Sequence, residues 1–230
     1  MRVATGIQEV DALTAKLVEA LPPPVVSVSD LPADAECARV SHKTAGLLDL
    51  RHRVRLRQLG ASGFDDECLR VVGRIASLEH LQLMNLKVSD LRAISGLRRL
   101  RTLSISVGSR LKSLDGIETL RHLELFSAWH VPRLASIQAV ERLAGLRVLF
   151  LAGGMYRPIR VPSLAPLAGA RGLLSLTLSG FRVADRSLAP LAHLRSVRIL
   201  ELPLHFAAEE FKTLATALPH ARGTWRSQLE

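Results

Sequence analysis

The sequence predicts an α/β solenoid, in which short parallel strands stack into one curved sheet and short helices or 3-10 turns return along its convex side. Three observations predict this fold class: an aliphatic triplet recurs along the chain, the segments between triplets carry apolar residues every two to three positions, and both ends show the apolar spacing of capping helices. Of the 230 residues, 48% are hydrophobic but only 4% are aromatic, so we expect a mainly aliphatic core.

The pattern L-x-x-L-x-L occurs six times with conservative replacements only. Successive copies begin 22, 20, 26, 27 and 24 residues apart, in or near the range of about 20–29 residues known for such repeats. Alternate side chains of a strand point to opposite faces, so the last two aliphatic residues of each copy are expected in the core and the residue between them outside. The copies are Leu78-Leu81-Leu83, Leu100-Leu103-Ile105, Leu120-Leu123-Leu125, Leu146-Leu149-Leu151, Leu173-Leu176-Leu178 and Val197-Leu200-Leu202.

Two segments, LEHLQLMNLKVSDLRAISGL and SLAPLAHLRSVRILEL, carry a family resemblance. They are similar to bacterial leucine-rich-repeat proteins of the internalin type and to the short-repeat class found in phosphatase regulatory subunits. The resemblance covers roughly residues 78–205 and implies a leucine-rich-repeat array. The asparagine that usually follows the strand is missing from most copies, and Leu86 stands in its place in the first.

The chain is expected to have three parts. Residues 1–50 form an N-terminal helix and cap segment, because apolar residues between 7 and 21 follow helical spacing until three prolines interrupt them. Residues 51–205 form the array, with 51–77 as a divergent first repeat whose strand lies near residues 50–57 and whose helix runs from Phe64 to Ile75. Residues 206–230 form a C-terminal capping helix and tail, since a solenoid exposes its core unless its ends are covered.

Motifs and composition indicate a binding protein that is not an enzyme and uses no cofactor or metal. The sequence contains no Walker loop, HExxH helix or GxSxG elbow. Its two cysteines lack the spacing of a zinc site. The first residues lack the apolar run of a signal peptide, and no segment is long and apolar enough to span a membrane. We therefore expect a cytoplasmic protein of bacterial type with no membrane contact.

The net charge of +10 is unevenly distributed. Residues 1–50 hold 4 basic and 7 acidic residues, and the remainder holds 27 and 14. Such a field favours acidic partners through association rate and non-specific attraction. A protein partner with acidic character is expected, and nucleic acid is the less favoured alternative.

Stacking the triplets in register predicts a concave platform of outward-facing side chains. The expected central column is Gln82, Ser104, Glu124, Phe150, Thr177 and Glu201, flanked by one column with His80 and His122 and another with Met84 and Phe126. Aromatic, hydroxyl and a few charged groups fit a protein-binding surface better than a uniformly charged groove. The predicted partner-binding residues are His80, Gln82, His122, Glu124, Phe126, Trp129, Phe150, Met155 and Tyr156.

Within that set, the aromatic residues and Met155 gather on adjacent strands and on the two longest coils, near residues 126–160. Aromatic residues and methionine are enriched at the centres of interfaces. The alternative is that the long coils fold Trp129 and Tyr156 onto themselves. Both interpretations remain open from the sequence.

A second candidate site consists of four alternating arginines, Arg51, Arg53, Arg55 and Arg57. An extended segment would place all four guanidinium groups on one face, where they could hold phosphates or carboxylates. The alternative is a solvated edge strand that keeps the end of the sheet unpaired.

Three functional hypotheses follow. The first is a protein-protein interaction module that uses the concave face and the long loops. The second is a basic anion-binding or nucleic-acid-binding protein. The third is a regulator or immunity-type inhibitor of a neighbouring enzyme or toxin.

Overall fold

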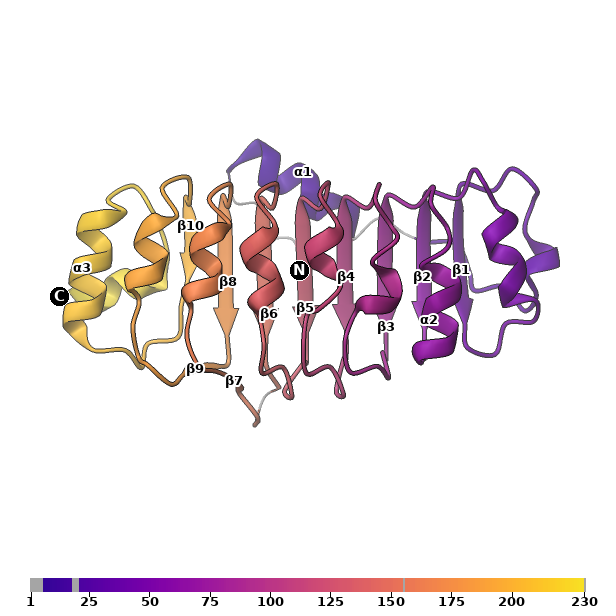
Figure 1. Cartoon of the computed structure of the whole chain (residues 1–230). Coiled ribbons are helices and arrows are strands. Elements are labelled where there is room, and N and C mark those ends of the chain that lie inside the picture. Colours follow the sequence, from indigo (N-terminus) through magenta and orange to yellow (C-terminus); the bar gives the residue numbers. More distant parts are fainter. Residues whose placement is uncertain (1–5, 18–20, 155, 230) are drawn as a thin grey trace.

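A computed structural model describes residues 6–17, 21–154 and 156–229, which form one curved solenoid (Figure 1). Eight parallel strands stack in chain order into a single sheet. They are β1 (Cys37–Ser41), β2 (Gln58–Ser62), β3 (His80–Met84), β4 (Thr102–Ser106), β5 (Leu125–Trp129), β6 (Val148–Ala152), β8 (Ser175–Ser179) and β10 (Ile199–Glu201). Two further strands, β7 (Ile159–Val161) and β9 (Phe181–Val183), form a separate parallel pair. The predicted fold class is confirmed.

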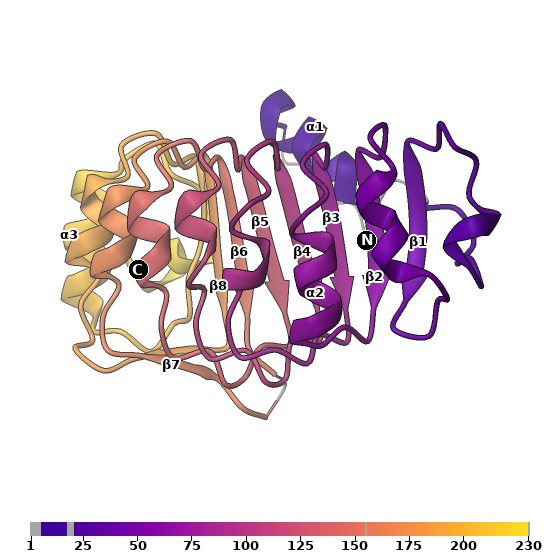
Figure 2. The same cartoon turned by 45° about the vertical axis from the view of Figure 1, so that its right-hand side comes forward.

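Short helices return along the convex side, opposite the sheet (Figure 2). The α-helices are α1 (Gln8–Leu17), α2 (Asp66–Val72) and α3 (Ala208–Ala217), of which α1 does not belong to the convex layer. The 3-10 helices are η1 (Val28–Asp30), η2 (Leu47–His52), η3 (Arg92–Ile94), η4 (Ile117–Thr119), η5 (Gln138–Arg142), η6 (Ala165–Gly169), η7 (Ala189–His193) and η8 (Thr224–Leu229).

Local sequence explains where α2 begins and how closely the coils stack behind it. The Asp65 carboxylate accepts a hydrogen bond from the backbone N–H of Cys68 at 3.0 Å, and acidic residues in the first turn favour the helix dipole. Gly73 ends the helix where the next coil comes close, because a Cβ there would lie 1.9 Å from the carbonyl oxygen of Ala93. A side chain at position 73 would force the two coils apart.

The core is one elongated stack of aliphatic side chains that runs the length of the solenoid. Every residue of the six predicted triplets is at most 5% exposed. At the C-terminal end, Phe211 and Leu214 of α3 pack with the fully buried Trp225 and close the stack. The aliphatic repeat therefore specifies the core directly.

The predicted register of the third copy is wrong. Strand β5 begins at Leu125, and Thr102 pairs with Leu125, which in turn pairs with Val148. The true triplet in this coil is Leu123-Phe126-Ala128, so Phe126 and Ala128 point into the core. The sequence LRHLELF offers both registers, and the one with more leucines was the misleading one.

The N-terminal coils also differ from the prediction. Strand β1 lies within the range expected to be a cap. The segment expected to form a strand near residues 50–57 is the 3-10 helix η2 and a turn, and the strand of this coil is β2. Leu50 and Leu56 are fully buried, which draws the segment into a tight turn. The helix expected between Phe64 and Ile75 is present as α2.

Candidate partner-binding face

The concave face carries three rows of outward side chains, because equivalent residues of neighbouring strands are paired without slippage. At the amino ends of the strands, the row is His80, Thr102, Leu125, Val148, Ser175 and Ile199. The central row is Gln82, Ser104, Ser127, Phe150, Thr177 and Glu201. At the carboxyl ends, the row contains Met84, Ser106, Trp129, Ala152 and Ser179.

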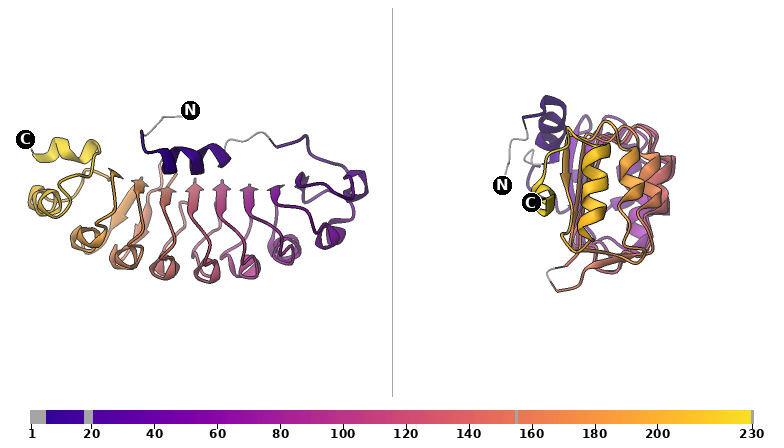
Figure 3. Two further views of the ribbon diagram at one scale, coloured as in Figure 1. Left: turned by 90° about the horizontal axis from the view of Figure 1, so that it is seen from above. Right: turned by 90° about the vertical axis from the view of Figure 1, so that its left-hand side faces the viewer.

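Helix α1 lies on the concave side, across the amino-end row (Figure 3). Val10 of α1 is 1% exposed and forms an apolar cluster with Leu125 and Val148, separate from the main core. Ile7, Leu13 and Leu174 pack around this cluster. The chain therefore covers the middle of the amino-end row with its own helix.

Further contacts hold the N-terminal segment across the sheet. Glu9 of α1 forms an ion pair with Arg147, with Oε1 3.4 Å from Nε. Farther along, the side chain of Leu21 lies so close to Gly60 of β2 that a Cβ there would be 2.4 Å from Leu21 Cδ1. The helix was predicted from its apolar spacing, but its docking site was not. The signal appears only in the corrected register, in which two aliphatic residues, Leu125 and Val148, occupy outward strand positions side by side.

The carboxyl-end half of the face is open and carries an aromatic pair. The rings of Trp129 and Phe150 stack with centroids 4.3 Å apart at an interplanar angle of 18°. Trp129 is 53% exposed, and its indole N–H donates to the hydroxyl of Ser127 at 3.1 Å. Met84 and Val107 add partly exposed apolar surface along the same edge. The indole is thus oriented by a ring stack and a hydrogen bond while one side faces solvent.

Three of the predicted partner-binding residues do not lie on this platform. Phe126 is fully buried in the core, so its assignment to the exposed patch is wrong. Glu124 precedes β5 and pairs with Arg101 at 3.0 Å, and His122 is exposed on the turn before the strand. All three errors have one cause, because shifting the third copy by three residues moves Ser127 and Trp129 onto the face in their place.

The other predicted residues are placed as follows. Gln82 is in the central row, and His80 lies in the amino-end row with Nδ1 2.9 Å from the hydroxyl of Thr102. Tyr156 is 90% exposed on the loop between β6 and β7. Met155 lies outside the described residues. Of the predicted aromatic patch, the structure brings Trp129 and Phe150 into contact.

The predicted arginine ladder does not form. Arg51 belongs to η2, where its Nε lies 3.1 Å from Nε2 of His52. Arg53 donates to the carbonyl oxygens of Pro32 and Val28 at 3.2 and 2.9 Å. Arg55 lies in the turn that follows, and Arg57 forms an ion pair with Glu79. Because the segment is not extended, the four guanidinium groups share no face.

The environment of Cys68 does not activate its thiol. Cys37 and Cys68 are not joined in a disulfide bond. Burial raises the pKa of the Cys68 thiol, and the Asp65 carboxyl group raises it further. Since the thiolate is the nucleophilic form, this environment suppresses nucleophilic chemistry at Cys68.

Neither a metal-binding cluster nor a membrane-spanning helix occurs in the described part of the chain. No group of His, Cys, Asp or Glu side chains among residues 6–17, 21–154 and 156–229 is arranged to hold a metal ion. Among the same residues, no helix combines the length and the apolarity needed to cross a bilayer.

Solved structures share this fold. Internalin C2 of Listeria monocytogenes matches with a TM-score of 0.54 and 16% identity, over 79% of this chain and 69% of its own. A leucine-rich-repeat protein of Leptospira interrogans gives a TM-score of 0.52 and 15% identity, over 87% of this chain and 63% of its own. TLR13, solved in a complex with ssRNA13, gives 0.59 and 18%, over 85% of this chain and 33% of its own.

No protein-family model and no curated protein matches the sequence. The structural likenesses and the strand register together establish that the chain has the leucine-rich-repeat fold with internalin-like architecture.

Proposed function

We propose that the chain is a non-enzymatic protein-binding module, which holds one protein partner on the open, carboxyl-end half of its concave face. The observation that carries this proposal is the Trp129–Phe150 stack, with Trp129 53% exposed on a continuous sheet surface. Tryptophan is among the residues most often found at the energetic centre of interfaces. A hydrogen bond and a ring stack already fix its orientation, so little rotamer entropy is lost on binding.

Helix α1 limits where a partner can bind. It covers Leu125 and Val148 in the middle of the amino-end row, and the central and carboxyl-end rows stay open together with the exposed loop that carries Tyr156. Thr177 pairs directly with Phe150 and supplies a polar group next to the aromatic pair. Ser104 and Gln82 lie farther along the same central row. An aromatic centre with a polar surround has the composition expected of a protein interface.

The charge near this half of the face favours a partner with acidic character. Arg133 and Arg157 lie with Tyr156 around a shallow depression beside the long loop. Opposite charge at the rim of an interface accelerates association more than it tightens binding. An acidic protein whose apolar side chain contacts Trp129 is the partner that fits both features.

The test is a variant pair matched for exposure. Trp129→Ala combined with Phe150→Ala removes the aromatic centre, whereas Leu48→Ala combined with Val54→Ala removes two exposed apolar side chains at the other end of the solenoid. We expect capture of one partner from a lysate of the host organism by the wild type and by the control pair. Binding of that purified partner should weaken by about 30-fold or more in the aromatic variant.

Thermal unfolding decides between binding and packing. The aromatic variant should melt within a few degrees of the wild type, because Trp129 is half exposed. If it unfolds, or if it binds the partner as well as the control does, the pair serves packing and the proposal fails.

A salt titration addresses the nucleic-acid alternative. Two solved structures with this fold contain other ligands, the ssRNA13 of the TLR13 complex and the RGF2 of a plant peptide hormone receptor. Binding driven by phosphates weakens by orders of magnitude between about 50 and 200 mM salt, whereas aromatic-centred binding should change little. Regulation or inhibition of a neighbouring enzyme or toxin is a more specific form of the same proposal, and the identity of the captured partner tests it.

A further inference from the structure

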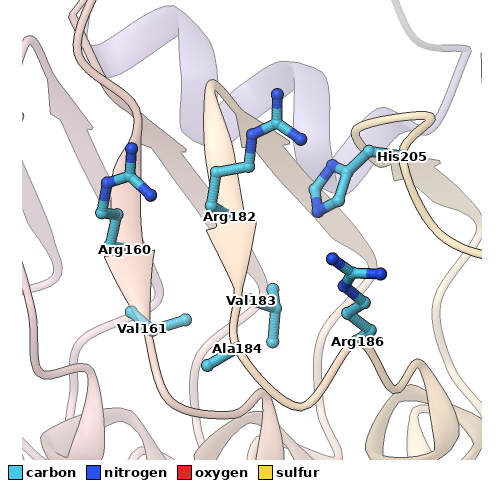
Figure 4. Close-up of a pocket in the computed structure, with 7 residues that line it drawn as sticks. All are labelled: Arg160, Val161, Arg182, Val183, Ala184, Arg186 and His205. Atoms are coloured by element: carbon cyan, nitrogen blue, oxygen red, sulfur yellow. The ribbon is translucent and has the colours of Figure 1, made fainter.

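Two arginines lie side by side where the chain leaves strands β6 and β8. Arg160 of β7 and Arg182 of β9 are direct partners in this short parallel sheet. Each is the exposed middle residue of its strand, between buried neighbours. Because paired residues of adjacent strands project to the same face, both guanidinium groups stand on one side of the sheet (Figure 4).

Arg186 and His205 extend this pair into a pocket of about 630 Å³. Arg186 follows β9 in a turn and adopts the left-handed backbone region, with φ of 52°, which is costly for a residue with a Cβ. His205 comes from the loop after β10, and Val183 and Ala184 supply the apolar wall. Figure 4 shows the side chains of Arg186 and His205 on one side of Arg182, with Arg160 on its other side.

The arginines of this pocket have no acidic partner among the residues that the structure describes. No acidic residue lines it, and Arg160, Arg182 and Arg186 form no ion pair with any other described residue. Two other carboxylates in this region form hydrogen bonds elsewhere. The Asp185 carboxylate accepts a hydrogen bond from the backbone N–H of Ser187, and the Glu210 carboxylate accepts one from the backbone N–H of Leu188. Like charges directly opposite each other on neighbouring strands destabilise a sheet.

His205 lines the same pocket and has a ring nitrogen without a hydrogen-bond partner. Its Nε2 is buried and has no hydrogen-bond partner in the structure, while its ring stacks on Phe206 with centroids 4.5 Å apart. Burial lowers the pKa of His205, and the charges of Arg182 and Arg186 lower it further. As the tautomer with hydrogen on Nε2, the neutral ring keeps one hydrogen-bond donor that no described group of the protein satisfies.

We propose that Arg160, Arg182, Arg186 and His205 form a binding site for a phosphoryl group, either inorganic phosphate or the phosphate of a small monoester. A tetrahedral dianion satisfies two adjacent guanidinium groups at once and relieves their mutual repulsion. Guanidinium forks match phosphate geometry, and a third arginine with an imidazole N–H can reach the remaining oxygens. This site is independent of the proposed protein-binding face and can be tested separately.

The test measures binding of inorganic phosphate and of phosphoserine by isothermal titration calorimetry, at constant ionic strength. Arg160→Gln and Arg182→Gln each remove one member of the pair. Arg99→Gln is the matched control, because Arg99 is exposed on another coil and the change in net charge is the same. We expect saturable one-site binding by the wild type and the control, and a loss of about tenfold or more in affinity for each pocket variant.

The two ligands identify the source of the phosphoryl group. Tighter binding of phosphoserine indicates a phosphorylated small molecule, and equal affinity indicates phosphate itself; both support the site. Equal weakening by Arg99→Gln, or no saturable binding of either ligand, would overturn it. So would binding of a single-stranded oligonucleotide that depends on Arg160 while phosphate and phosphoserine do not bind.

Folding of the variants provides an independent check. Without ligand, Arg182→Gln should melt at or slightly above the wild-type temperature, because one of two like charges is removed. Phosphate should raise the melting temperature of the wild type and of Arg99→Gln but not of Arg182→Gln. A melting temperature that falls in Arg182→Gln without ligand would mean that the arginine serves packing and would contradict the proposal.

Discussion

The sheet has one edge formed by the amino ends of its strands and one formed by their carboxyl ends, and the two edges differ in how charged and apolar residues are arranged. At the amino ends of the strands, the residues just before β2 to β6 alternate in charge, and the ion pairs Arg57–Glu79, Arg101–Glu124 and Arg147–Glu9 join them. Two apolar residues of that edge, Leu125 and Val148, are covered by α1. At the carboxyl ends, Trp129 is half exposed and Arg160, Arg182 and Arg186 lack acidic partners among the described residues.

Both edges are built from the same repeat, so the contrast does not come from the fold. The aliphatic positions of each coil are buried at both edges alike. The residues between the aliphatic positions differ. Charged residues just before the strands form ion pairs at the amino ends, whereas at the carboxyl ends the indole of Trp129 is half exposed and three arginines line a pocket that no described acidic residue lines. This contrast is the reason why both proposals place binding at the carboxyl ends of the strands.

The largest expected effect is on the free energy of unfolding, in variants that test the register of β5. Phe126 and Trp129 are three residues apart in β5, yet Phe126 is fully buried and Trp129 is half exposed. Phe126→Ala should lower the free energy of unfolding by about 3–5 kcal/mol. Trp129→Ala should lower it by about 1 kcal/mol, the scale of one aromatic stack. Urea unfolding of both variants measures this, and similar losses would show that the two faces of β5 are assigned wrongly.

An intermediate loss of stability is expected from a substitution in the apolar cluster beneath α1. Leu125→Asp places a carboxylate in the apolar cluster with Val10 and Val148, and the helix should leave the sheet because a buried, unpaired charge is costly. We expect a loss of about 2 kcal/mol and faster amide hydrogen exchange in residues 8–17. Ser106→Asp, on the open edge of the neighbouring strand, should leave that exchange unchanged. Retained protection of α1 in Leu125→Asp would disprove the contact.

The smallest expected effect is a pH dependence of stability, which comes from His205 in the arginine pocket. Burial lowers the pKa of His205 below its ordinary 6.5, followed by the charges of Arg182 and Arg186. The folded chain therefore binds fewer protons than the unfolded one, so this contribution to stability is complete above about pH 6.5 and is lost as the pH falls through the folded pKa. His205→Gln should show a smaller loss of stability between pH 7 and 5.

Sulfate extends the His205 experiment because, unlike phosphate, it keeps its charge over this range of pH. An anion bound beside the ring stabilises the imidazolium form and raises its pKa. An NMR titration of the His205 ring should therefore give a higher pKa with sulfate than without it. An unshifted pKa in sulfate would argue against an anion beside this histidine.

The sequence was sufficient to predict the solenoid and most of its register, because aliphatic spacing is a local signal and reports burial directly. It was insufficient where two registers place similar side chains inside, as in the coil that contains Leu123, Leu125 and Phe126. It also failed at Arg51 to Arg57, where alternation indicated a strand but two buried leucines produced a tight turn. The docking of α1 and the convergence of Arg160, Arg182 and His205 depend on contacts between different coils, which no local pattern encodes.

Helix α1 has a consequence for how this protein unfolds. In a solenoid each coil contacts only its neighbours, so an array can lose its end units one at a time. Here one N-terminal segment bridges residues of β5 and β6 and reaches Gly60 on β2, so coils that do not touch each other share a common contact. That bridge couples the middle of the array to its beginning, and we expect the whole stretch to melt as one cooperative unit.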